Sequence, residues 1–339
     1  YCVGGQPEKE ILIPQPRRMS VFTATMGKES ATAFNPMTAI TGLSKMLTEL
    51  HYQWDISSPT TDYNDYGAII LNHSTCESEE VDQIIESVKN GALLIACHEG
   101  LKGKTPEATR KLQEFLSIDE LEMLPDPGCY YQVKEALNAN MPDMPIYTHT
   151  RSYRMTLQPD METLAELMLP SVVRSRKAFY GHFHGVAQKA TGSAVAAKPF
   201  GKGKVVVIAP SLFYSYMETG HVHHLNLVKT LLSKYFPEPK RRIKSDAPGI
   251  VELALSRKNG DLVLQAVPFI VSRRHVDSFE VLNDAVAVHG INVAVQSGFK
   301  PSRIFDPVNN TNIDFNMNGD WIHFVLPPFD EHLVVIIRP

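Results

Sequence analysis

Cys97 is a candidate nucleophile because of its residue type and its position. It follows the apolar run Ala92–Ala96, which is typical of a buried parallel strand, and a helix is expected to begin at Thr105-Pro106 beyond the next turn. A helix N-terminus near a thiol lowers its pKa and favours the reactive thiolate. The alternative interpretation is a small buried thiol at a strand end, which is the commoner role of a free cysteine.

Two groups of histidines are candidates for binding. His182 and His184 lie two residues apart and would share a face of a strand, while His221, His223 and His224 form a second group. Two such groups can supply the imidazole ligands of a zinc site. Neither group comes with an obvious carboxylate ligand, however. We therefore predict no metal site, and consider polar packing, a subunit contact or a position near a bound sugar as the alternatives.

Three aromatic residues form a third candidate site. Phe213, Tyr214 and Tyr216 follow Val205–Ala209, an expected strand of the same sheet. Ligands gather at the carboxyl ends of strands in open α/β folds, and aromatic rings stack against sugars. Packing under the next helix is the alternative.

The elements that position these residues alternate between strand and helix. Short apolar strands and helices with one apolar face follow one another up to about residue 238, which predicts a flavodoxin-like parallel sheet covered by helices on both faces. Turn motifs between residues 120 and 180 predict an excursion from that sheet. The expected strands are Met19–Thr25, Ala68–Leu71, Ala92–Ala96 and Val205–Ala209, and the expected helices include 77–89 and 222–236.

The last part of the chain has a different period. Residues 249–339 show the two-residue alternation of strands, and Asn259-Gly260 is a strong hairpin signal because both residues tolerate positive φ. These features predict an antiparallel β-sandwich. The complete prediction is a linker over 1–17, an α/β domain over 18–238, a Pro-rich and basic linker over 239–248, and the sandwich over 249–339.

Composition narrows the classes of function. The 339 residues fit two domains, and a net charge of −4 gives no reason to expect nucleic acid as a partner. No apolar run approaches the ~20 residues of a membrane span. The four cysteines lack metal or disulfide spacing and are expected to be free thiols. The sequence begins at Tyr1 without a methionine, which suggests a trimmed or partial polypeptide, and it indicates no compartment.

Several segments, in their order and spacing, resemble those of one known family. They resemble the β-galactosidase trimerisation domain and the C-terminal β-domain of bacterial glycoside hydrolases. The matching segments are Tyr66–Asn72, Asn90–Ala96, Phe200–Val206, Pro210–Tyr216, Ser278–Asp284 and Asp320–Ile337.

The resemblance implies a fold related to class I glutamine amidotransferases that has lost their chemistry. In the family this domain lies beside the catalytic barrel and helps to assemble a trimer. Retaining glycosidases use two carboxylates ~5 Å apart, which the family places in a barrel of about 250 residues that this sequence does not supply. The resemblance thus implies a non-catalytic region, a carbohydrate substrate reached through an upstream barrel, a homo-oligomeric partner and no cofactor.

Two alternatives come from other classes of protein. Ala96-Cys97-His98 is similar to the nucleophile elbow of the DJ-1/PfpI family, and Glu29 falls near the position of that family's glutamate. This likeness implies a thiol enzyme that uses Cys97 with His98 and Glu29, although the expected glycine is displaced to Gly100. The other alternative is a stand-alone carbohydrate-binding protein, which would hold a sugar on the sandwich or at the sheet edge.

Overall fold

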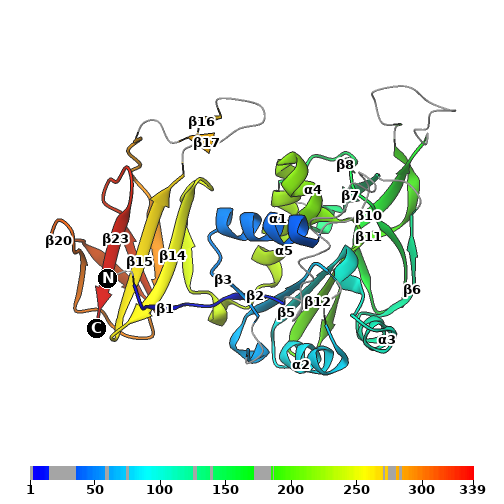
Figure 1. The fold of residues 1–339 in the computed structure, drawn as a ribbon, viewed down its shortest axis with the longest axis horizontal. Coiled ribbons are helices and arrows are strands. Elements are labelled where there is room, and N and C mark those ends of the chain that lie inside the picture. The colour runs from blue at the N-terminus through cyan, green and yellow to red at the C-terminus, as the bar shows by residue number, and fades with distance from the viewer. Residues whose placement is uncertain are drawn as a thin grey trace, which may run out of the picture. The chain divides into compact units, whose positions relative to one another are not determined.

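The computed structural model resolves the chain into two compact units (Figure 1). The sandwich unit comprises residues 1–10, 47–55 and 239–339, and the α/β unit comprises residues 11–46 and 56–238. The strand predicted over Met19–Thr25 lies outside the described residues. The structure describes residues 3–14, 36–57, 61–73, 76–124, 128–137, 140–171, 185, 187–269, 272–273, 280–281 and 285–339.

A nine-stranded mixed sheet forms the centre of the α/β unit. β2, β4, β5 and β12 are parallel neighbours, whereas β11, β10, β7 and β8 continue the sheet in antiparallel fashion. The predicted parallel sheet therefore accounts for one part of a mixed sheet. The order across the sheet is β3 (Trp54–Ile56), β2 (Ile11–Ile13), β4 (Ala68–Leu71), β5 (Leu93–Cys97), β12 (Gly203–Ile208), β11 (Ala187–Phe200), β10 (Glu162–Pro170), β7 (Cys129–Val133) and β8 (Ile146–Thr148).

The predicted excursion between residues 120 and 180 is largely an extension of this sheet. β7, β8 and β10 join it, and only β6 (Ile118–Met123) and β9 (Tyr153–Leu157) form a separate two-stranded sheet. In β7 the residues alternate between buried and half-buried, rather than forming a continuous apolar run. Such alternation is typical of antiparallel strands, and it is a weak sequence signal in strands this short.

Five helices in the described residues complete the α/β architecture: α1 (Pro36–Glu49), α2 (Ser78–Lys89), α3 (Pro106–Phe115), α4 (Leu212–Thr219) and α5 (Val222–Tyr235). α2 and α3 cover one face of the sheet, and α4 and α5 cover the other (Figure 1). Thr105 caps α3 by accepting the N–H of Ala108 at 3.1 Å, with Pro106 as the first helical residue. None of the described helices is long and apolar enough to cross a membrane.

Helix α1 crosses α4 at Gly42. A Cβ atom at this position would lie 2.0 Å from the carbonyl oxygen of Phe213. Glycine is disfavoured inside helices, so its presence here is explained by this close approach of two backbones. Gly42 therefore fixes the packing of the helix that carries the predicted aromatic site.

Two antiparallel sheets form the sandwich itself, with an apolar core between them, and β16 (Ser272–Arg273) and β17 (Glu280–Val281) form a separate two-stranded sheet in the same unit. The two-residue turn Asn259-Gly260, with φ of 51° and 88°, confirms the predicted hairpin. One sheet has the order β1 (Gln6–Pro7), β14 (Val251–Lys258), β15 (Asp261–Pro268), β23 (Leu333–Arg338), β19 (Arg303–Asp306) and β20 (Thr311–Asn312). The other has the order β13 (Ile243–Ser245), β18 (Asn292–Gln296), β22 (Trp321–Val325) and β21 (Phe315–Asn318).

Residues far apart in the sequence close the sandwich unit around the carboxylate of Glu10. This fully buried carboxylate accepts hydrogen bonds from the guanidinium of Arg241 and the N–H of Gln53, each at 2.7 Å, and from the N–H of Arg242. The side-chain oxygen of Gln53 in turn accepts the N–H of Leu255 at 2.8 Å. The segments predicted as linkers, 1–17 and 239–248, thus contribute Glu10, Arg241 and β13 to this unit.

Candidate functional site

Several polar residues, including the candidate His98, lie at the carboxyl edge of the parallel strands of the α/β unit. Because β4, β5 and β12 are parallel, the residues that follow them meet at one edge of the sheet. His73 follows β4, His98 and Glu99 follow β5, and Ser211 follows β12.

Cys97, the predicted nucleophile, is the last residue of β5 and is 1% exposed. Its thiol donates a hydrogen bond to the carbonyl oxygen of Pro210 at 3.3 Å. Burial raises the pKa of Cys97 to about 12, although the backbone N–H groups of Leu212 and Phe213 at the start of α4 lower it. A helix N-terminus thus acts on the thiol, but it is that of α4 and not that of the helix expected at Thr105. Desolvation dominates, and the thiol is protonated at neutral pH. Cys76, Cys97 and Cys129 are all free and buried, as predicted.

His98 occupies the strained position of the turn after β5. Its φ of 50° lies in the left-handed region, where a non-glycine residue is uncommon. Its ring is buried against Tyr153, with 4.9 Å between the ring centroids. Burial, assisted by the neighbouring charges of Lys102 and Arg151, lowers the pKa of His98 to about 3. The strained turn position that the sequence predicts at Cys97 is therefore occupied by the next residue, His98, whose imidazole is neutral near pH 7.

A polar cluster that the sequence analysis missed lies beside His98. The hydroxyl of Tyr153 donates to the carboxylate of Glu99 and accepts from the ammonium of Lys102, which is 3.8 Å from Glu99. Burial and the carboxylate of Glu99 raise the pKa of Tyr153. Tyr153 and Glu99 are 54 residues apart, so no local motif could reveal the contact. The cluster offers one paired carboxylate, not the two facing carboxylates that glycoside hydrolysis requires.

The second histidine group forms a packed polar cluster where α4 meets α5. His224 is fully buried, with Nδ1 2.9 Å from the hydroxyl of Tyr131 and Nε2 3.1 Å from that of Ser215. Its ring stacks on His221 with 4.9 Å between centroids. Burial lowers the pKa of His224 to about 3, assisted by the nearby imidazoles of His221, His149 and His223.

His221 and His223 lie closer to the surface than His224. Their ring centroids are 5.2 Å apart, and both side chains are half-buried. Burial and the neighbouring imidazoles lower the pKa of His221. Across the part of the chain that the structure describes, no group of three or more His, Cys, Asp or Glu side chains is arranged to hold a metal ion. His182, His184 and Glu29 lie outside the described residues.

The three predicted aromatic residues lie on α4 and divide between core and surface. Phe213 and Tyr216 are buried, whereas Tyr214 is half-buried. Burial and the carboxylate of Glu218 raise the pKa of Tyr214. Of the three, Tyr214 therefore presents the most accessible ring at this edge.

Comparison with known proteins gives matches among solved structures only. No family model and no curated protein matches the sequence. Alpha-L-fucosidase isoenzyme 2 from Paenibacillus thiaminolyticus superposes with a TM-score of 0.80 at 18% identity, over 99% of this chain and 49% of that one. The beta-galactosidase from Bacillus circulans sp. alkalophilus gives a TM-score of 0.60 at 12% identity, over 99% and 42%. The beta-galactosidase from Rahnella sp. R3 gives 0.60 at 14% identity, over 99% and 42%.

In each of these matches, nearly the whole of this chain superposes on one part of a larger protein. Each of the three neighbours is a glycoside hydrolase by name, and this chain spans half of its length or less. At such low identity the likeness is one of fold.

Proposed function

We propose that this chain is the non-catalytic C-terminal region of a glycoside hydrolase, in which it assembles the oligomer and walls the active site of a catalytic barrel. One observation carries the proposal: 99% of the chain superposes on the fucosidase, but it covers only 49% of that enzyme. The remaining half of such an enzyme is long enough to hold a barrel of about 250 residues.

The chemistry at the sheet edge supports a non-catalytic role. Cys97 is a protonated buried thiol, and His98 and His224 are neutral buried imidazoles. Glu99 is held by Tyr153 and Lys102. These groups are fixed by packing and by one another, as expected of a scaffold rather than of a site that must exchange protons with a substrate.

Oligomer assembly is the second part of the proposal, and a trimer is its expected form. Tyr214, His221 and His223 are the described residues best suited to a subunit or sugar contact, because they combine aromatic or polar rings with partial exposure. His182 and His184 stay candidates for the same role on the sequence alone.

Size and light scattering of the polypeptide from its native host test this proposal. We expect a polypeptide of about twice the 37.8 kDa of this chain, assembled as a trimer. Tyr214→Ala together with His223→Ala should weaken the trimer, whereas Lys229→Ala on the exposed side of α5 should not. A monomer of about 37.8 kDa would overturn the proposal and leave a stand-alone protein.

The thiol-enzyme alternative needs an ionised Cys97, which burial opposes. Cys97→Ala distinguishes the two accounts. The scaffold account predicts unchanged activity of the native enzyme, and loss of a hydrolase or glyoxalase activity of the chain would favour the alternative.

A further inference from the structure

Three Asn-Gly pairs occur in the described residues, and the structure holds them in different ways. Asn90-Gly91 follows helix α2, whereas Asn259-Gly260 and Asn318-Gly319 lie at the tips of the β14–β15 and β21–β22 hairpins. The side-chain amide of an asparagine can be attacked by the backbone nitrogen of the next residue, and a glycine there has no side chain to shield that nitrogen. The contacts of each pair therefore decide which asparagine is free to react.

Hydrogen bonds hold both reacting groups of the pair after α2. The N–H of Gly91 donates to the carbonyl oxygen of Val88 at 3.0 Å. The side-chain amide of Asn90 donates to the side-chain oxygens of Asn64 and Glu86, each at 3.3 Å. These contacts must be broken before the nitrogen of Gly91 can reach the amide, so they protect Asn90.

The pair at the tip of the β14–β15 hairpin lacks such contacts. Within the part of the chain that the structure describes, neither the side-chain amide of Asn259 nor the N–H of Gly260 has a hydrogen-bond partner, and both residues are exposed. Asn259 also has a φ of 51°, a left-handed conformation that is uncommon for a residue other than glycine. The two groups can therefore meet without the loss of a hydrogen bond by either.

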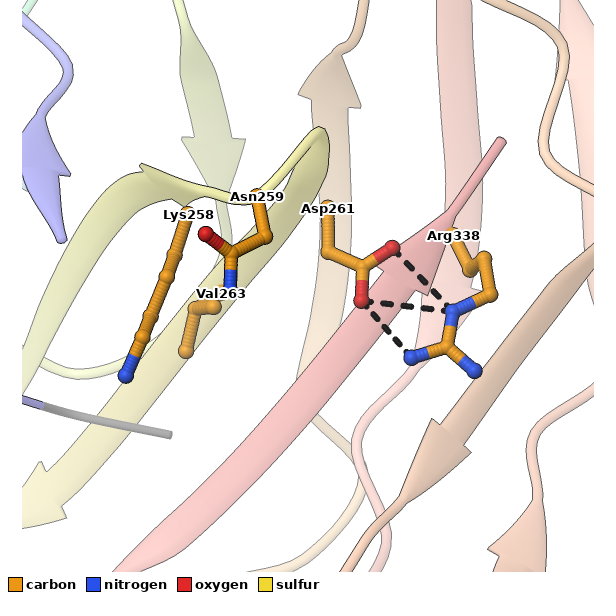
Figure 2. Close-up of a pocket in the computed structure, with 5 residues that line it drawn as sticks. All are labelled: Lys258, Asn259, Asp261, Val263 and Arg338. Atoms are coloured by element: carbon orange, nitrogen blue, oxygen red, sulfur yellow. Dashed lines mark hydrogen bonds and ion pairs between the residues drawn. The ribbon is translucent and has the colours of Figure 1, made fainter.

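A pocket beside this hairpin gives water access to the asparagine (Figure 2). Its volume is about 390 Å³, and Asn259 lines it together with Lys258, Asp261, Val263 and Arg338. In Figure 2 the marked interactions join Asp261 to Arg338, and none reaches Asn259. The amide of Asn259 is therefore open to water and is not tied to the other side chains of the pocket.

We propose that Asn259 is a self-modification site that converts to aspartate and isoaspartate. The backbone nitrogen of Gly260 loses its proton to water and bonds to Cγ of Asn259, while the side-chain amide leaves as ammonia and a five-membered succinimide remains. Water then opens this ring. Cleavage of the bond to Cγ gives aspartate, and cleavage of the bond to the backbone carbonyl gives isoaspartate, whose main chain runs through Cγ. The reaction needs only the chain and water, so it does not depend on the proposed function.

Either product places a new carboxylate beside the charged row of the sandwich unit. This row consists of Lys258, Asp261, Arg338 and Arg303, which are aligned by the strand register and by the ion pair of Asp261 with Arg338 at 2.8 Å. Isoaspartate also lengthens the main chain by a CH₂ group, so the two-residue turn no longer matches the pairing of Lys258 with Asp261. The isoaspartate form should therefore unfold at a lower temperature than the aspartate form.

Peptide mapping by mass spectrometry tests the site in the folded 339-residue chain. The chain is incubated at mildly alkaline pH in water enriched in heavy oxygen, which marks the conversions that occur before digestion. We expect Asn259 to convert about tenfold faster than Asn90, the size expected for about one hydrogen bond that must first be broken. Asn318 should also convert more slowly than Asn259, because its backbone is fixed in β21 by pairing with Trp321. Conversion of Asn90 or Asn318 as fast as that of Asn259 would overturn the proposal.

The same chain in urea is the reference for the effect of the fold. Without the native contacts, the three asparagines should convert at similar rates. A preference for Asn259 of the same size in urea would show that its sequence neighbours select it, and would overturn the structural explanation.

Two variants test the chemistry of the site. Asn259→Gln keeps an amide but would need a less favourable six-membered ring, so it should stay unmodified. A carboxyl methyltransferase specific for isoaspartate should label the incubated native chain at residue 259 and leave Asn259→Gln unlabelled there. Absence of label from the native chain would overturn the isoaspartate assignment. Asn259→Asp supplies the aspartate form, and an isoaspartate form that unfolds at the same temperature would overturn the predicted effect on the turn.

Discussion

The carboxyl edge of the α/β unit and the charged row of the sandwich unit treat ionisable side chains in opposite ways. At the α/β edge, Cys97, His98 and His224 are buried, and burial shifts the pKa of each toward its neutral form. In the sandwich unit, Lys258, Asp261, Arg303 and Arg338 form one row across β14, β15, β23 and β19. Their side chains are half-buried or exposed and are held by an ion pair, amide oxygens and the ring of Phe305.

This difference teaches that residue type alone is a poor guide to a site. The α/β edge carries the residues that sequence analysis favours for chemistry, yet desolvation favours the neutral form of Cys97, His98 and His224. The residues of the sandwich row carry no recognisable motif, but the strand register aligns their charged side chains on one face of the sheet.

Among single substitutions, the largest expected effect is at Glu10, whose carboxylate is buried in the sandwich unit. Glu10→Ala would leave the guanidinium of Arg241 buried without its carboxylate, and should lower the free energy of unfolding by about 3–5 kcal/mol. Urea unfolding measures this loss. Glu252→Ala removes the same charge from an exposed position of β14 and should change the stability by less than about 0.5 kcal/mol. Equal losses in the two variants would show that the Glu10 cluster is not a special stabilising contact.

Acid should destabilise the α/β unit more than the sandwich unit. Burial lowers the folded-state pKa of His73 to about 4 and of His98 and His224 to about 3, from 6.5. Above pH 6.5 the imidazoles are neutral in both states and change nothing. As the pH falls below 6.5 only the unfolded state takes up protons, so each histidine costs about 1.4 kcal/mol per pH unit until its folded pKa is reached.

Spectroscopy can assign this acid effect to one unit. Trp321 belongs to the sandwich unit, whereas the helices α2 to α5 belong to the α/β unit. Trp54 lies on β3 at the edge of the nine-stranded sheet, so the measurement uses a Trp54→Phe variant, which keeps Trp321 as the single tryptophan. On going from pH 7 to pH 5, the urea midpoint followed by far-UV circular dichroism should fall by more than the midpoint followed by tryptophan fluorescence. If the two urea midpoints fall by the same amount, the acid effect is not specific to the α/β unit, and the comparison between the two units is wrong.

A smaller effect is expected where α1 crosses α4. Gly42→Ala should destabilise the α/β unit by about 1–3 kcal/mol, because the new methyl group meets the carbonyl of Phe213 and this clash outweighs the helix propensity of alanine. Gly192→Ala is the control, since nothing lies within 4 Å of its Cβ position. Circular dichroism during thermal unfolding measures both. Stabilisation by Gly42→Ala would show that the two helices are not in close contact.

Local elements could be predicted from the sequence, because their causes are local. The strand Ala68–Leu71, the helix after Thr105 and the hairpin at Asn259-Gly260 each follow from apolar runs, a cap or a turn. The antiparallel half of the nine-stranded sheet could not be predicted, since β7 and β8 are short strands without a continuous apolar run.

Contacts between distant residues explain what sequence analysis missed at the sites. Glu10 and Arg241 are 231 residues apart, and Asp261 and Arg338 are 77 apart. The raised pKa of Cys97 results from burial by residues from several parts of the chain, and no sequence motif identifies those residues. The positive φ of His98 likewise became visible only with the backbone.

Hydrolysis by two forms of the protein tests the central claim most directly. The native polypeptide and the isolated 339-residue chain would be assayed side by side on aryl α-L-fucosides and aryl β-galactosides. The account predicts that the native polypeptide releases the aglycone from at least one of them and that the isolated chain releases none. Turnover by the isolated chain, abolished by a substitution at the carboxyl edge such as Glu99→Gln, would contradict it.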